Sequence, residues 1–507
     1  MRLLLALAAA ALAGLNACSQ GSGRSGSGAS PPWDGKPPPA TCTAPVALRD
    51  VSSPTAVVGD GTPESCTEAD LRAQAAAVDQ GGGGILVFDC GPDPVTITLS
   101  SQLAFTHDTV LDGGGTITLS GGGTTRILYL DSSYDQATPR LWVQRLTFAS
   151  GASQREAGGD TASGGAAIYR NGGSLTVVDC AFLGNQAPST GQDLAGGAIY
   201  AFGGGDTVVV GSTFVGNSAS DGGAIGSLNG GLTVVNSAFT GNQATGTGGN
   251  PGDGGCGGAL YQDGSAETTT LCGVTVQGNQ AGAIGGGVFR VSDTDDGTMS
   301  VDLTTVDSNE VTADGAGDAG GLYLQGLALT VTRTTISRNS AWYGGGLWIS
   351  KGTMQIADST VADNEASVNG GGLWLSYSPP GAILNCTIAD NQSTGDNTVA
   401  GAIFGDGPTL VNTIVSGNTA PWSPGCSGPL SDGGGNLEWP AGADCAAGAL
   451  VADPLLGTLA DNGGATLTML PAAESPARGL GTSSCPAVDQ RGVARANPCT
   501  AGAVEVP

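Results

Sequence analysis

Acidic side chains gather most densely in one short loop. In the segment Asp293-Thr294-Asp295-Asp296-Gly297, three aspartates lie within four residues, and carboxylate oxygens at such spacing can coordinate Ca²⁺. Acidic turn residues are more often only solvated. We therefore regard Asp293, Asp295 and Asp296 as candidates for a structural Ca²⁺ ion, and expect no other cofactor.

Proton abstraction assisted by a metal would need aspartate ligands on one sheet and an arginine or lysine nearby as the base. The further candidate groups are Asp206, Asp221, Arg170, Arg290, Arg333, Arg338 and Lys351. None of the bases occupies a repeat-equivalent position beside a group of aspartates, so we assign no catalytic residue. A zinc site is excluded because the chain has no Cys-x-x-Cys pair and His107 is its single histidine.

Repeated short strands must position these side chains. Between residues 185 and 418 the chain repeats a Gly-Gly pair, an apolar run, a turn, a second apolar run and an asparagine, as in GGAIGSLNGGLTVVNSAFTGN. The shortest repeats are 25 residues long, enough for three short strands and three turns, and longer ones carry insertions at corners. Alternate residues of each run point inward to an apolar stack. The pattern predicts an all-β solenoid.

One asparagine closes each repeat. Asparagine tolerates the left-handed backbone region, and its amide can bond to the backbone at a corner. Stacked coil on coil, these side chains should form a hydrogen-bonded ladder at the strand spacing of about 4.8 Å. The predicted ladder consists of Asn185, Asn217, Asn242, Asn279, Asn309, Asn339, Asn364, Asn391 and Asn418.

The GGAI and FxxN motifs resemble those of right-handed parallel β-helices, in particular bacterial repeat proteins of the polymorphic outer-membrane type. The resemblance covers residues 85–420 and implies the fold but no activity, because one fold supports many functions. Pectate lyases share the fold, so the alternative function is a lyase-like, Ca²⁺-dependent enzyme acting on polysaccharides. The paired aspartates and Gly-His-Gly of polygalacturonases are absent.

The two ends of the repeat region differ from it. Thr67-Glu68-Ala69-Asp70 is typical of a helix start, so residues 42–84 should form a cap with a short helix. Residues 421–507 resemble the choice-of-anchor Q module of surface proteins through Asp453-Pro454-Leu455, Asp461-Asn462-Gly463-Gly464 and Asp489-Gln490-Arg491-Gly492. We expect Arg491 to form a structural ion pair there.

The first residues have the features of a targeting segment. Arg2 precedes an apolar stretch, Leu3 to Leu12, that is too short to span a bilayer. Leu15-Asn16-Ala17-Cys18 resembles the bacterial lipobox, which implies that residues 1–17 are a signal peptide and that Cys18 carries lipid. Residues 18–41 form a Gly/Ser/Pro tether. These features predict anchoring to the bacterial outer membrane, with exposure at the cell surface.

The charge and the aromatic residues limit the partners. A formal net charge of −27 disfavours nucleic-acid binding. Expected partners are the membrane, through the lipid, and surface glycans or other cell-surface proteins.

Trp348 and Trp374 lie at the same distance after the glycines of their repeats, so their side chains should share one column of the stack. We expect this column in the core. Alternation along the strands also allows the other direction, in which the column would form an aromatic strip on the outside. The leading function is a non-catalytic surface protein in adhesion or envelope structure.

Twelve cysteines are consistent with an exported, oxidised protein. We expect short-range bridges Cys66–Cys90, Cys426–Cys445, Cys485–Cys499 and Cys256–Cys272, although connectivity does not follow from sequence alone. Cys180 and Cys386 match the position of Ser237 in another repeat, so both should be buried small residues rather than nucleophiles. Cys42 has no obvious mate.

Overall fold

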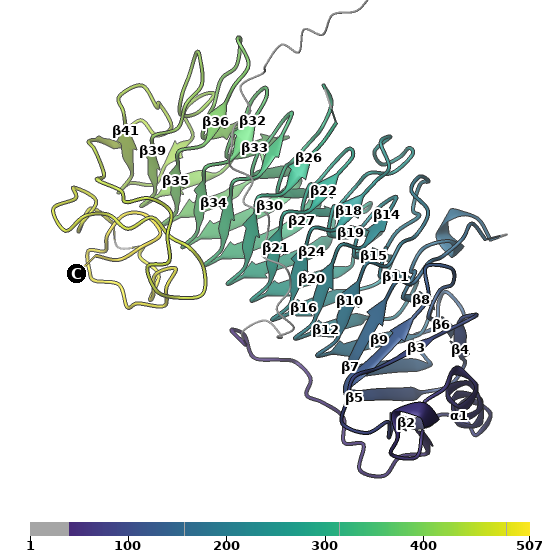
Figure 1. Cartoon of the computed structure of the whole chain (residues 1–507). Coiled ribbons are helices and arrows are strands. Elements are labelled where there is room, and N and C mark those ends of the chain that lie inside the picture. Colours follow the sequence, from purple (N-terminus) through teal and green to yellow (C-terminus); the bar gives the residue numbers. More distant parts are fainter. Residues whose placement is uncertain (1–39, 157, 314, 483, 507) are drawn as a thin grey trace, which may run out of the picture.

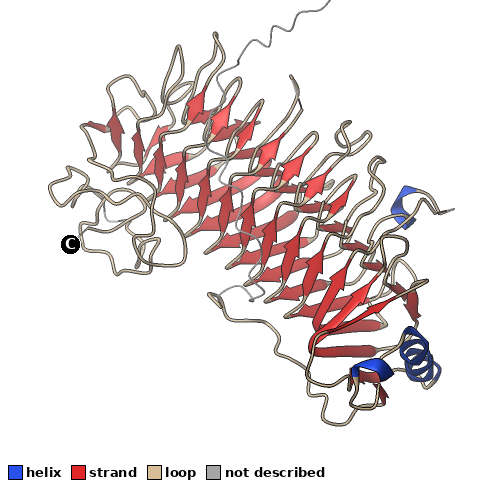
Figure 2. Cartoon of the chain, in the orientation of Figure 1, coloured by secondary structure: helices blue, strands red, loops and turns tan. Residues whose placement is uncertain are grey.

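Parallel strands wind around one axis and pile up into a long stack in the computed structural model, which describes residues 40–156, 158–313, 315–482 and 484–506 (Figures 1 and 2). Every strand-to-strand pairing in the described stack is parallel, and the register is interrupted between β5 and β7, after Asp112. Cys18, the signal peptide and most of the tether lie outside the described residues, so export and lipidation stay predictions.

Each coil in the middle of the stack contributes a strand to each of three faces. The first face contains β4 (Leu103–Phe105), β6 (Leu128–Asp131), β8 (Ile168–Asn171), β11 (Ile199–Phe202), β15 (Ile225–Leu228), β19 (Leu260–Asp263), β23 (Val288–Val291), the first half of β27 (Leu322–Thr332), the first half of β30 (Leu347–Ala357), β33 (Leu373–Ser376) and β37 (Ile403–Phe404). The second face contains β1 (Ala56–Val58), β2 (Gly84–Phe88), the first halves of β5 (Thr109–Ser120) and β7 (Arg140–Ala149), β9 (Ser174–Val178), β12 (Thr207–Val210), β16 (Leu232–Val235), β20 (Thr268–Cys272), β24 (Gly297–Asp302), the second halves of β27 and β30, β34 (Gly381–Leu384), β38 (Thr409–Val411) and β40 (Ser431–Asp432).

The third face and one corner complete the coil. The third face contains β3 (Val95–Thr98), the second halves of β5 and β7, β10 (Ala181–Leu183), β13 (Thr213–Val215), β17 (Ala238–Thr240), β21 (Thr275–Gln277), β25 (Thr305–Asp307), β28 (Thr335–Ser337), β31 (Thr360–Ala362), β35 (Thr387–Ala389), β39 (Ile414–Ser416), β41 (Leu437–Trp439) and β42 (Leu450–Val451). The corner sheet contains β14 (Ser218–Ala219), β18 (Gln243–Ala244), β22 (Gln280–Ala281), β26 (Glu310–Val311), β29 (Ser340–Ala341), β32 (Glu365–Ala366) and β36 (Gln392–Ser393).

The core follows from alternation along each strand. On the third face, Phe148, Phe182, Phe214 and Phe239 point inward from four successive coils, and their rings stack with centroids 4.6 to 4.9 Å apart. Because like side chains lie above like, one apolar core extends through the stack without a domain boundary. The predicted all-β parallel β-helix is confirmed.

The asparagine ladder forms as predicted. From Asn185 to Asn418, each Nδ2 donates to the Oδ1 of the next ladder asparagine at 2.9 Å. Each Nδ2 also donates to a backbone carbonyl of the preceding coil, as Asn217 does to Phe182. The ladder residues are almost fully buried, so every amide proton and oxygen that leaves water finds a partner.

The backbone at the corner differs from the expectation, because the ladder asparagines themselves do not adopt the left-handed conformation. The residue before it does: Gly216 has φ 62°, and Asp363 and Asp390 have φ 57° and 56°. This leaves the asparagine extended enough to direct its amide along the stack. Glycine at most of these preceding positions relieves the strain that a side chain would meet there.

A short helix and a disulfide close the N-terminal end. Helix α1 (Glu68–Gln80) starts at Thr67, whose side chain accepts from the backbone N–H of Asp70. Its buried face packs against β1 and β2, the first strands of the stack (Figure 1). The predicted cap with a short helix is therefore present. Two 3₁₀ turns, η1 (Pro63–Ser65) and η2 (Asp160–Ala162), are the other helical segments described.

The C-terminal segment folds back along the stack. Strands β40 to β42 follow residue 420, where the sequence placed the start of the module, and still pair with the coils. Beyond β42, Gln490 lies buried between Thr335 and Thr360 of two coils, at 2.9 and 2.7 Å. Arg491 pairs with Asp489 at 2.9 Å, the structural ion pair that the sequence predicted.

Three of the four predicted disulfides form, and the fourth prediction is wrong. The bridges Cys66–Cys90, Cys426–Cys445 and Cys485–Cys499 are present. Cys272 instead bonds to Cys42, and Cys256 is a free buried thiol. The reason is placement: Cys272 ends a strand of the second face, whereas Cys256 packs with the outward aromatic residues of the first face.

Candidate functional site

The first face carries an outward column of aromatic side chains that is interrupted once, at Gly226. Inward Leu347 and Ile349 are buried, and Trp348 between them points away from the core. The register places it in one column with the aromatic residues of neighbouring coils. The column consists of Tyr129, Tyr169, Tyr200, Gly226, Tyr261, Phe289, Tyr323, Trp348, Trp374 and Phe404. The expectation that Trp348 and Trp374 lie in the core is wrong, because the residues on either side of each tryptophan are the ones whose side chains point inward.

The late end of this column is half-exposed. Trp348 and Trp374 stack with ring centroids 4.6 Å apart and planes 14° apart, and Phe404 follows at 4.1 Å. Tyr343 meets the edge of Trp374 at 5.2 Å. The indole N–H of Trp374 donates to the Ser376 hydroxyl. Because the rings cover one another's faces, the column presents ring edges to the surroundings, as an apolar ridge.

The middle of the column is covered by loops and lies beside a group of acids. The Tyr261 hydroxyl bonds to Asp193 at 2.7 Å and to Asp263 at 3.1 Å. Asn250 donates to Asp263 at 2.6 Å. A small cavity of about 150 Å³ adjoins them, lined in part by Asp263, Asp293 and Tyr323. Burial raises the pKa of the Asp193 carboxyl, and the neighbouring charge of Asp263 adds to that shift.

The Ca²⁺ candidates do not come together as a ligand set. Asp295 lies 3.5 Å from Lys351, and Thr294 donates to Asp296. Asp293 faces the small cavity, away from that pair. Among the described residues, no three metal-binding side chains are close enough to hold an ion.

Most of the candidate bases are structural. Arg170 and Arg290 are fully buried and donate to backbone carbonyls, such as that of Gly173 at 2.7 Å. Burial lowers the pKa of both guanidinium groups to about 10. Arg333 and Arg338 each bridge to an aspartate of the preceding coil, Asp302 and Asp307.

Asp221 is buried and accepts from the Cys256 backbone N–H at 2.9 Å, and burial raises the pKa of its carboxyl well above its usual value. Burial also raises the thiol pKa of Cys180 and Cys386 to about 12, which fits their prediction as inert core residues.

A second concave surface lies where residues 40–55, here called the strap, cross the second face. Besides the Cys42–Cys272 bridge, the Cys42 N–H bonds to Asn236, and Arg49 exchanges two backbone hydrogen bonds with the side chain of Gln144. The Arg49 guanidinium lies over the ring of Trp142, 4.7 Å from its centroid. No local sequence pattern indicates this arrangement, because its contacts join residues that are between 95 and 230 positions apart in the chain.

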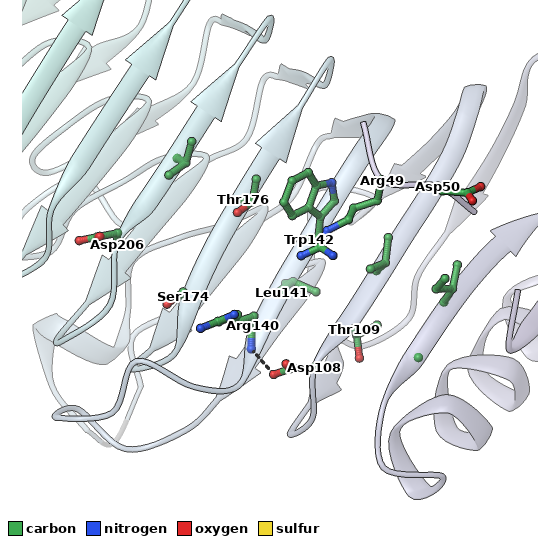
Figure 3. A pocket seen from close by; sticks show the side chains of 14 residues that line it. Arg49, Asp50, Asp108, Thr109, Arg140, Leu141, Trp142, Ser174, Thr176 and Asp206 are labelled. Carbon is green, nitrogen blue, oxygen red and sulfur yellow. Dashed lines mark hydrogen bonds between the residues drawn. The ribbon is translucent and has the colours of Figure 1, made fainter. Parts of the chain in front are cut away.

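Between the strap and the strands lies a cavity of about 490 Å³, here called the strap groove. Figure 3 shows Trp142 beside Arg49, and Arg140 between Ser174 and Asp108, whose carboxylate accepts from the Arg140 backbone N–H at 2.8 Å. Its lining residues are Arg49, Asp50, Gly84, Ile85, Asp108, Thr109, Val110, Arg140, Leu141, Trp142, Ser174, Thr176, Asp206 and Val208. Asp206, one of the acidic groups named from the sequence as a candidate for catalysis, therefore lines this groove.

Comparison with known proteins agrees with this architecture. A family model described as a right-handed β-helix region matches residues 258–437. The matched residues lie within the stack, and the fold of the chain is a parallel β-helix. No curated protein matches it. Within the described residues, no helix has the length and apolar character needed to cross a bilayer.

Two solved structures are distantly similar to the β-helix. One is the crystal structure of PfbA, a surface adhesin of Streptococcus pneumoniae, with 11% identity, a TM-score of 0.38 and coverage of 82% of this chain and 98% of that one. The other is a mutant of the periplasmic alginate epimerase AlgG, with 10% identity, a TM-score of 0.29 and coverage of 78% and 84%. Neither similarity is strong enough to carry an argument about function.

Proposed function

We propose that this β-helix is a non-catalytic cell-surface protein that acts in adhesion or envelope structure and is held to the bacterial outer membrane by lipid on Cys18. The observation that carries the proposal is the late end of the aromatic column. Trp348, Trp374 and Phe404 form a half-exposed apolar ridge on the outside of the stack. Exposed aromatic ridges of this kind mark contacts with partners.

The ridge favours a protein partner over a sugar. Sugar rings pack on the flat faces of aromatic rings, and here the faces of Trp348 and Trp374 are covered by their neighbours. Ring edges suit the apolar side chains of another cell-surface protein. Tyr377 and Trp422, which are 79% and 73% exposed in loops of the late coils, add to this apolar surface.

A cell-attachment assay tests this role. Cells that carry the Trp374→Ala, Phe404→Ala double variant should attach several-fold less to partner cells than wild-type cells, with the protein still folded by circular dichroism. Trp439→Ala, which removes an exposed tryptophan from β41 on the third face of the stack, should leave attachment unchanged. Equal attachment by all three strains would refute the proposal.

The anchor is tested separately. Cys18→Ala should release the protein from the membrane into the medium or periplasm, as followed by cell fractionation and lipid labelling. Retention of the variant in the membrane would remove the lipid from the proposal.

The second candidate is a polysaccharide-active enzyme. It is supported by Asp193 and Asp263, two carboxylates that share the Tyr261 hydroxyl beside a cavity on the aromatic column. A carboxyl with a raised pKa next to a second carboxylate can act as a general acid. Incubation with acidic polysaccharides, with and without a chelator, should then yield new reducing ends or unsaturated products that Asp193→Asn abolishes. Absence of products supports the non-catalytic role.

A further inference from the structure

Two arginines in the strap groove have unused hydrogen-bonding capacity. Across the described residues, every other arginine or lysine side chain donates to a carboxylate, hydroxyl or carbonyl oxygen. The guanidinium groups of Arg49 and Arg140 have no such acceptor among these residues. Both line the same groove, one from the strap and one from β7.

The fold holds the backbone of both arginines and orients the guanidinium of Arg49. Arg140 begins β7, where its backbone N–H bonds to Asp108. Arg49 is fixed by its backbone bonds to Gln144, and its guanidinium is placed over Trp142. Guanidinium groups that are already oriented lose less entropy when they bind a carboxylate in a bidentate manner.

The remaining lining combines three carboxylates and several hydroxyls with apolar side chains. Asp50, Asp108 and Asp206 can accept from hydroxyl groups of a ligand, and the hydroxyls of Ser174 and Thr176 can donate or accept. Val110 and the ring of Trp142 supply apolar contact. Three carboxylates beside two guanidinium groups would repel a densely charged polyanion, so the lining fits a ligand in which single acidic groups are separated by hydroxyls.

The groove floor excludes pairing with a peptide strand. Strands β2, β5, β7, β9 and β12 run below the groove, and each is hydrogen-bonded to neighbours on both sides. Recognition must therefore use side chains. With rungs about 4.8 Å apart, these five strands give the groove a length of about 19 Å, which suits an oligomer rather than a single sugar.

We propose that the strap groove is a binding site for an oligosaccharide that carries carboxylate groups. Arg49 and Arg140 bind the carboxylates, and Asp108 and Asp206 accept from the sugar hydroxyls. The site lies on the second face and uses none of the aromatic ridge on the first face, so it extends the proposed function and does not depend on it.

Isothermal titration of the purified protein tests the site. The probes are tetrasaccharides of galacturonate, mannuronate, guluronate and hyaluronate, each beside its methyl ester, together with an acidic peptide. At least one free acid should bind at least tenfold more tightly than its ester, and salt should weaken that binding. The proposal is overturned if no acid exceeds its ester, or if the acidic peptide binds as tightly as the best saccharide.

Variants assign the binding to the groove. Arg49→Gln with Arg140→Gln should weaken binding of the best tetrasaccharide at least tenfold. Arg155→Gln, which removes an exposed arginine outside the groove, should not. Trp374→Ala with Phe404→Ala should also bind normally, which separates this site from the proposed adhesion role. Unchanged binding by the groove variant, with its circular dichroism intact, would place the saccharide elsewhere.

Discussion

Buried amides hold the corner of every coil at the residue scale. Asn309 accepts from the backbone N–H and the Nδ2 of Asn279, and donates to Val276 and Asn339. All four bonds lie out of water, where a donor or acceptor without a partner costs about 1 to 3 kcal/mol. The ladder therefore fixes the register of the coils as well as stabilising them.

Removal of one ladder side chain should be costly. Asn309→Ala leaves the backbone N–H of Asn279 without its acceptor and removes one of the two acceptors of the Asn279 Nδ2, so we expect the unfolding free energy to fall by about 3 kcal/mol or more. Urea denaturation followed by fluorescence measures the change. Asn397→Ala, at an exposed loop position, is the matched control and should change stability by under about 0.5 kcal/mol. A ladder variant as stable as this control would contradict the role given to the amides.

Buried carboxyls give the protein a particular pH dependence. Burial raises the pKa of Asp318 from its usual value to about 6. The folded state thus binds more protons than the unfolded state between about pH 4 and pH 6, and this contribution to stability is lost as pH rises through 6.

Asp318→Asn should therefore raise the unfolding free energy at pH 7.5, by about 1 kcal/mol, and have little effect near pH 4. Thermal denaturation at the two pH values measures both. Asp135→Asn removes the same formal charge at an exposed position and serves as the control. A gain in stability that is equal at both pH values would show that the carboxyl is not the cause.

Single residues differ in how far sequence predicts them. The ladder could be assigned because each coil must turn at the same corner, which gives asparagine a visible period. The direction of Trp348 could not, since alternation along a strand has two phases and only the register against Leu347 and Ile349 decides between them. The exposed ridge was therefore missed.

Long-range elements were hidden for a different reason. The strap, residues 40–55, has no repeat and no strand pattern, and it runs back from Cys272 to the first coil. Cys42 and Cys272 are 230 residues apart, so no local spacing could pair them. The strap groove depends on this element and was equally beyond prediction.

Loss of the Cys42–Cys272 bridge should loosen the strap alone. In the double variant Cys42→Ser, Cys272→Ser, we expect trypsin to cleave after exposed Arg49 several-fold faster, because only hydrogen bonds and the packing of Val46 still hold the segment. Mass spectrometry of timed digests measures the rate. The Cys485→Ser, Cys499→Ser variant, which opens a bridge in the C-terminal module, should leave that rate unchanged. Equal rates in the wild type and the Cys42 variant would mean that the bridge does not secure the strap.

At the scale of the whole molecule, both ends of the chain fold back onto the same side of the stack. The strap reaches the coil of Gly273, where Thr41 and Cys42 lie close to it. The C-terminal segment begins its contacts at the coil of Arg333 and continues to Asn412. One coil, that of Leu303, separates the two. The first face, with its aromatic ridge, is left to other partners.

This arrangement predicts which coil can be removed. Deletion of residues 280–309 takes out the separating coil, and Glu310 then follows Asn279 at an equivalent position, so the ladder and the strands stay in register. The strap and the C-terminal segment keep their own contacts. The deletion removes Asp302 and Asp307, and the arginines that paired with them, Arg333 and Arg338, are partly exposed and can be solvated instead. The shortened protein should fold, with its β-sheet circular dichroism retained and a modestly lower melting temperature.

Deletion of residues 340–364 removes a coil of the same kind from beneath the C-terminal segment. Thr360, which bonds to Gln490, and Asp358, which pairs with Arg495, go with it. Thr335 and Thr387 then become neighbours, and a segment that contacts the four successive coils of Arg333, Asp358, Asn385 and Asn412 loses one coil from the middle of that series. This variant should melt at a clearly lower temperature than the first, and its C-terminal segment should be cleaved faster by protease. If both deletions lower the melting temperature by the same amount, each coil is stabilised only by its nearest neighbours, and the folded-back C-terminal segment adds no long-range constraint.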